Sequence, residues 1–203
     1  MEPLAVKTAP VHSENLPSGQ SYLEWGAVWG GGVVAIATST VLGQFGGTAG
    51  LALGEPMLAN GEPSWQVLVA SLWLFVTALA SSAGGGYIAG RMRSRWNDAA
   101  KTEVEFRDGV HGLAVWAVST LAVAAFVAIT AALSSIGVET GAISEIPENV
   151  AQYTRTITVV YGFAAGAAAA LGAGAAWWFA SLGGNHRDEA TDVHLITPGF
   201  LRR

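Results

Sequence analysis

Residues 25–53 read WGAVWGGGVVAIATSTVLGQFGGTAGLAL, and none of these side chains is ionisable. Three further apolar stretches follow at 65–90, 110–134 and 156–181. Each is longer than the ~20 apolar residues that cross a ~30 Å hydrocarbon layer as a helix. Their polar interruptions are small residues rather than a polar face at helical spacing, which a soluble helix of this length would carry. The sequence therefore predicts an all-α integral membrane protein built as a four-helix bundle.

The composition agrees with this prediction and excludes several classes of function. Of the 203 residues, 51% are hydrophobic and 12% are charged, against roughly a quarter charged in soluble domains. The net charge of −5 argues against binding to nucleic acid. Cysteine is absent, which excludes disulfides, thiolate metal sites and cysteine nucleophiles. We predict no catalytic residue, no metal site and no cofactor.

The chain divides into three parts. Residues 1–21 are polar and punctuated by proline, which predicts a disordered tail. They contain no apolar core typical of a cleavable signal peptide, so the first helix is expected to direct insertion. A transmembrane domain is predicted over 22–183, and a second polar tail over 184–203. Its spans are predicted at about 25–46, 65–90, 110–134 and 156–181.

The first apolar stretch is longer than one span needs. At 1.5 Å per residue, a straight helix over 25–53 would be roughly 43 Å long. Gln44 is followed by Gly46, Gly47 and Gly50, which indicates a helix that ends near Gly43 and an irregular segment after it. The alternative is one continuous tilted helix, because membrane helices tolerate glycine.

The distribution of basic residues predicts the orientation in the membrane. Of the ten Lys and Arg residues, only Arg155 falls on the side that holds the links 54–64 and 135–152. The other nine lie in the two tails and in the 91–107 link. The positive-inside rule then places both termini and that link in the cytoplasm.

Small residues recur at a spacing of four along the spans. Residues four apart share a helix face, and small side chains there let two helix backbones approach closely. This pattern predicts either packing within the bundle or a face for a second copy or partner protein. The residues concerned are Gly26, Gly30, Ser82, Gly86, Gly90, Gly162, Gly166, Ala170 and Gly174.

Ionisable residues gather near the cytoplasmic helix ends. Asp108 and His111 are three apart and share one helix face, and a carboxylate beside an imidazole would make a proton-responsive pair. The other interpretation is a helix start, with Asp108 in the first turn and His111 among the headgroups. Arg91, Arg93 and Arg95 are predicted to fix the orientation and to contact anionic lipid headgroups.

Three motifs resemble a family of small bacterial inner-membrane proteins that are labelled PhnA-like. The motifs are EWGAVWGG at 24–31, GGYIAGR at 85–91 and RDGVHGLAVWA at 107–117. The resemblance covers about 22–135. It implies a multi-pass protein of the bacterial inner membrane, and it carries no established activity to any residue.

These features favour a non-enzymatic accessory or scaffold subunit of a homo- or hetero-oligomeric membrane complex. One alternative is a small-solute transporter or channel, which the glycine segment 43–50 indicates. Another is a cytoplasmic-side pH or lipid sensor built on Asp108 and His111. None of the four predicted spans has a carboxylate, lysine or arginine near its middle, the groups that ion-coupled pumps commonly use.

Overall fold

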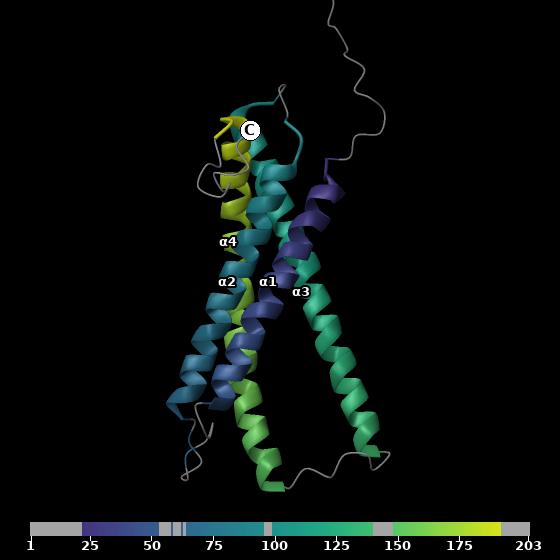
Figure 1. Ribbon diagram of the computed structural model, residues 1–203, viewed down its shortest axis with the longest axis vertical. Coiled ribbons are helices and arrows are strands. Elements are labelled where there is room, and N and C mark those ends of the chain that lie inside the picture. The colour runs from purple at the N-terminus through teal and green to yellow at the C-terminus, as the bar shows by residue number, and fades with distance from the viewer. Residues whose placement is uncertain are drawn as a thin grey trace, which may run out of the picture.

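The computed structural model describes residues 22–52, 58, 62, 64–95, 99–139 and 148–191. This part of the chain contains four α-helices, each with a segment long and apolar enough to cross a membrane. The predicted all-α four-helix bundle is confirmed, and the chain is a multi-pass membrane protein. In chain order the helices are α1 (Trp25–Ala52), α2 (Trp65–Met92), α3 (Lys101–Glu139) and α4 (Glu148–Asp188) (Figure 1).

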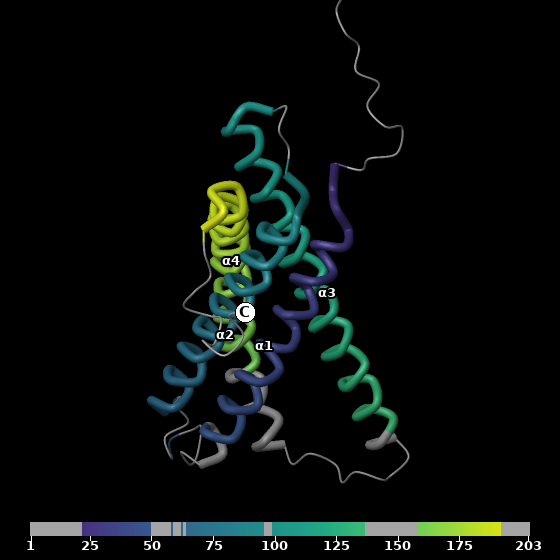
Figure 2. The backbone as a smooth tube through the Cα atoms, turned by 45° about the horizontal axis from the view of Figure 1, so that its top comes forward, coloured from purple at the N-terminus to yellow at the C-terminus, as the bar shows by residue number. Residues whose placement is uncertain are grey.

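The two ends of the bundle differ. At the end termed the closed end, α1 and α3 begin, α2 and α4 end, and the helices lie together (Figure 1). At the opposite end, termed the open end, α3 diverges from the other three helices in both views (Figures 1 and 2). Helix α2 contacts each of the others, whereas α1 and α4 do not meet within the described residues. As a result, every residue of α3 from 120 to 136 is exposed.

Helix α1 does not end where the sequence predicted. It continues through the glycine segment to Ala52, so the expected helix end near Gly43 is wrong, and the helix is longer than the predicted span 25–46. Gly46 instead makes room for Trp73 of α2, because a Cβ on Gly46 would overlap the indole ring. The Trp73 Nε1–H also donates a hydrogen bond of 2.8 Å to the carbonyl oxygen of Leu42. This glycine therefore serves helix packing rather than helix termination.

Two other helices are longer than their predicted spans. Helix α3 begins at Lys101 instead of 110, and α4 runs from Glu148 to Asp188 instead of 156–181. The additional residues at the ends of these apolar stretches are partly charged and continue the same helices. A helix does not have to end where the hydrocarbon layer ends. The first part of the predicted tail 184–203 is thus helical. The predicted tail 1–21 and residues 192–203 lie outside the described residues.

The core of the closed end consists of small side chains on α1, α2 and α3. Val28, Ala35, Ala89 and Val115 are buried together. Next to them α1 and α2 approach so closely that a Cβ on Gly31 would overlap the carbonyl oxygen of Gly85. Such close approach of two backbones maximises dispersion contacts, which hold helices together in lipid.

Helices α2 and α4 pack by the same means. A Cβ on Gly86 would overlap the backbone of Ala176, and a Cβ on Gly90 would overlap the backbone of Ala180. Both glycines are buried. One predicted small-residue face, the one on α2, therefore lies against α4 inside the bundle.

Candidate functional site

A buried group of charged residues joins three helices at the closed end. Asp108 of α3 accepts a hydrogen bond of 2.6 Å from Nε of Arg93, and their side chains are 1% and 0% exposed. Arg187 of α4 approaches the same carboxylate, with Nη1 at 3.4 Å from Oδ1 and Nη2 at 3.5 Å from Oδ2. These three residues, Arg93, Asp108 and Arg187, are termed the clasp. One carboxylate thus lies between two guanidinium groups from two other helices.

Local backbone geometry brings the clasp together. Arg93 directly follows α2 with extended backbone (φ −65°, ψ 147°), and its N–H donates to the carbonyl oxygen of Ala89. Arg187 lies in the last turn of α4, where a cation is favoured by the helix dipole. Its Nη1 donates to the carbonyl oxygen of Gly90 at 2.8 Å. Gly184 leaves space for the Asp108 carboxylate, because a Cβ there would overlap it.

The chemistry of the clasp is that of a structural ion pair. Both Asp108 oxygens have guanidinium partners, and the side chain is 1% exposed, so the carboxylate does not face a substrate. Loss of one member of a buried pair typically costs about 3–5 kcal/mol, because it leaves an uncompensated charge. The Nη1 and Nη2 atoms of Arg93 are buried without a hydrogen-bond partner among the described residues. The clasp therefore connects α2, α3 and α4 through a single carboxylate.

His111 has different partners from Asp108. Its Nε2 accepts a hydrogen bond of 2.9 Å from the backbone N–H of Glu24, and its Nδ1 lies 2.7 Å from the carbonyl oxygen of Arg107. Because a backbone N–H can only donate and a carbonyl can only accept, the ring is neutral with its hydrogen on Nδ1. His111 thus fixes the start of α1 against α3. The predicted proton-responsive pair has no mutual hydrogen bond in this arrangement.

The predicted orientation arginines are engaged within the protein. Arg91 donates to the carbonyl oxygen of Thr191 at 2.9 Å, and Arg95 donates to that of Arg187. Arg93 is buried in the clasp and does not face headgroups, so the prediction of a lipid contact is wrong for this residue. Its partner Asp108 holds it inside. The clasp as a whole was missed from the sequence; its one signal was Asp108, a carboxylate two residues before the apolar stretch 110–134.

The predicted small-residue faces have different environments. Ser82, Gly86 and Gly90 are buried in the bundle, and Gly30 lies beside Met92. On Gly26, Gly162, Gly166 and Gly174 an added Cβ would meet nothing within 4 Å. Ala170 is also exposed. The face on α4 is therefore uncovered along its whole length.

Metal binding has no support in the described part of the chain. No group of three or more His, Asp or Glu residues there is arranged to hold an ion. His186 instead lies 3.2 Å from the hydroxyl of Tyr87 through its Nδ1.

Comparisons with known proteins add no relative to these observations. No family model matches the chain, and neither a curated protein nor a solved structure does.

Proposed function

We propose that the chain is a non-enzymatic subunit of the bacterial inner membrane, with both termini in the cytoplasm, that assembles with a second copy or with another membrane protein. The closed end fixes the fold of the subunit. The open end receives a transmembrane helix of the partner. The resemblance to PhnA-like proteins agrees with the proposed location.

The observation that carries this proposal is the uncovered length of α3. Every residue from 120 to 136 is exposed, including Leu121 at 70% and Phe126 at 68%. Just before this part the same helix is packed on α4, where the Nε1–H of Trp116 donates to the carbonyl oxygen of Ala169 at 2.9 Å. The change from buried and half-buried residues over 108–119 to exposed residues over 120–136 supports a role for the exposed part in association.

The facing side of α4 is suited to close packing. Gly162 is seven residues before Ala169, so it lies about two turns away on nearly the same side of the helix. Gly166 lies between them. Both are exposed and have open space around their Cα atoms. A partner helix between α3 and α4 would meet small residues that allow close backbone contact.

The absence of a reactive arrangement in the clasp supports a non-enzymatic role. Its carboxylate is occupied by two arginines, and the neutral His111 has backbone partners on both ring nitrogens. A general base needs a free lone pair within reach of a substrate proton. Neither residue offers one in this arrangement.

Purification from native membranes in mild detergent tests the proposal. We expect the full chain to elute as a defined oligomer or with a defined partner, and Gly166→Leu to shift it towards the monomer. Gly43→Leu is the control, because Gly43 is also exposed with open space around it, on α1. A wild-type chain that is a lone monomer from native membranes would contradict the proposal.

A small-solute transporter or channel is the second candidate. It is favoured by one observation, a cavity of about 310 Å³ that all four helices line. Solute flux into proteoliposomes above that of empty vesicles would support it. Flux equal to empty vesicles over a broad panel of solutes would exclude it. The third candidate, a pH or lipid sensor, is not favoured, because Asp108 and His111 each have other partners.

A further inference from the structure

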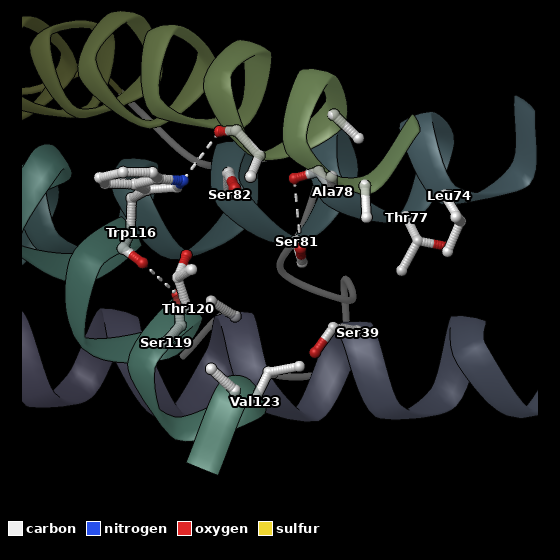
Figure 3. Close-up of a pocket in the computed structure, with 15 residues that line it drawn as sticks. Ser39, Leu74, Thr77, Ala78, Ser81, Ser82, Trp116, Ser119, Thr120 and Val123 are labelled. Carbon is white, nitrogen blue, oxygen red and sulfur yellow. Dashed lines mark hydrogen bonds between the residues drawn. The ribbon is translucent and has the colours of Figure 1, made fainter. Parts of the chain in front are cut away.

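The cavity lies in the middle of the bundle, where α3 begins to diverge. Its lining includes Ser39 of α1, Thr77 and Ser81 of α2, and Ser119 of α3. These positions lie near the midpoints of the candidate spans of their helices. Figure 3 shows Trp116 at one end of the hollow and Leu74 with Thr77 at the other. The cavity is therefore at mid-membrane depth, between the packed and the diverging parts of α3.

The size and lining of the cavity suit a small ligand. A volume of about 310 Å³ is at the lower end of the range for small-molecule sites. Most of the lining atoms are apolar, and none of the lining residues is ionisable. Charged ligands are costly at this depth without a partner of opposite charge. The lining therefore selects a neutral, mainly hydrocarbon molecule.

The hydroxyl groups of the lining define the polar part of that molecule. The hydroxyls of Ser39, Ser81 and Ser119 donate to the carbonyl oxygens of Ile36, Ala78 and Val115, respectively. Their hydrogens are used within their own helices, so towards a ligand these oxygens act as acceptors.

Thr77 differs from these serines. Its Oγ1 is buried and has no hydrogen-bond partner among the described residues. An unpaired buried hydroxyl costs free energy. Rotation about χ1 of Thr77 would bring the hydroxyl to the cavity surface, where a ligand oxygen would recover that free energy. Ser82 and Thr120 also line the cavity, and neither hydroxyl has a hydrogen bond among the described residues. The cavity thus offers free donors beside several acceptors, and a hydroxyl group matches both because it accepts and donates.

From this inventory we infer that the mid-membrane cavity binds a neutral lipid-soluble alcohol, with its hydroxyl group between Thr77 and the serine oxygens and its hydrocarbon body along the apolar lining. The ligand enters from the bilayer at the open end, where α3 stands away from the other helices (Figure 1). A straight-chain alcohol and a prenyl alcohol share this chemistry. Neither requires a partner protein, so binding to the purified monomer does not depend on the proposed assembly.

Photolabelling of the full chain in nanodiscs of phosphatidylethanolamine and phosphatidylglycerol tests the inference. The probes are a straight-chain alcohol with a diazirine in its chain, a prenyl alcohol with the same group, and the hydrocarbon that matches the first. We expect an alcohol to label the peptides around Thr77 and Ser119 about three- to tenfold more than the hydrocarbon does, as one or two hydrogen bonds would give. Stronger labelling by either alcohol than by the hydrocarbon supports the site. The alcohol that labels more strongly shows whether the hydrocarbon part of the ligand is straight or prenyl.

Two variants place the ligand in the cavity. Thr77→Val keeps the side-chain shape and removes the hydroxyl, so labelling by the alcohol should fall about three- to tenfold while labelling by the hydrocarbon is unchanged. Thr130→Val is its control, because Thr130 is exposed on α3 and does not line the cavity. Ala165→Phe should fill the cavity and abolish labelling by both, whereas Ala167→Phe, an exposed position on the same helix outside the lining, should not.

Three results would overturn the inference. The first is equal labelling by the alcohol and the hydrocarbon, which would mean that only an acyl chain fills the cavity. The second is labelling by the alcohol that Thr77→Val does not change. The third is labelling of peptides away from the cavity. A melting temperature within the wild-type range establishes that each variant is folded. Where Ala165→Phe does not fold, Thr77→Val alone decides.

Discussion

The closed and open ends are built from the same four helices and from similar residues, yet they differ in how much of each helix is covered. At the closed end, glycines on α2 touch the backbones of α1 and α4, and the clasp adds a buried ion pair. At the open end, glycines on α4 face open space and every residue of α3 from 120 to 136 is exposed. Small residues in a membrane helix therefore mark a face suited to packing, and only the structure shows whether that face is used inside the subunit.

The largest effect on stability is expected from the clasp. Asp108→Asn removes the negative charge between two buried guanidinium groups and should lower the free energy of unfolding by about 3–5 kcal/mol. Glu103→Gln is the matched control on the same helix. Glu103 pairs with Arg107 at 2.7 Å but its side chain is 48% exposed, so its loss should cost about 0–1 kcal/mol. Equal losses in an unfolding assay in detergent would show that the clasp is not a stabilising centre.

A smaller effect is expected from the contact between α2 and α4. Gly86→Leu places a side chain against the backbone of Ala176 and should destabilise the protein by about 1–3 kcal/mol. Gly84→Leu, two residues earlier on the same helix, has open space around its Cβ position and should be tolerated. Thermal unfolding of the two variants compares a covered and an uncovered glycine directly. Similar melting temperatures would contradict the close approach of α2 and α4.

The contact of Trp73 with α1 should contribute about 1 kcal/mol. Trp73→Phe removes the indole N–H that donates to the carbonyl oxygen of Leu42, at the net value of one hydrogen bond. Trp178→Phe changes the same residue type at a position that is 70% exposed and should have no measurable effect. If Trp73→Phe is also silent, the continuation of α1 through Gly46 does not depend on this contact.

The smallest effect on the isolated subunit is expected at the open end. Gly166→Leu should change the free energy of unfolding of the monomer by less than about 0.5 kcal/mol, because a Cβ added there has no described atom within 4 Å. Unfolding of the purified monomer measures this. A loss as large as that of Gly86→Leu would mean that α4 is covered at this position by part of the same chain.

The sequence predicted the helices better than their ends. Four apolar runs were sufficient to identify four spans, because crossing a membrane requires long apolar segments. Residues 101–107 are largely polar and were assigned to the 91–107 link, although α3 begins at Lys101. The additional turns place Asp108 inside the helix rather than at its start. An apolar pattern cannot indicate how far a helix continues into the headgroup region.

The partners of Asp108 and the divergence of α3 could not be read from the sequence. Arg93 and Arg187 come from separate helices, and their meeting at one carboxylate depends on tertiary packing. Helix α3 has no charged residue over 120–136, and its few polar residues are small. No periodicity therefore distinguishes a face covered by protein from one covered by lipid. The spacing of the α2 glycines identified them as a packing face. It did not identify the helix against which that face lies.

The central claim is that a partner covers the open end of α3. Site-specific photo-crosslinking in native membranes tests it most directly, with a benzophenone amino acid placed at one position at a time from 121 to 135. We predict protein adducts of defined mass at positions that recur every three or four residues, which correspond to one covered helix face. Adducts at no position, or equally at all of them, would mean that lipid surrounds this part of α3 and would contradict the account.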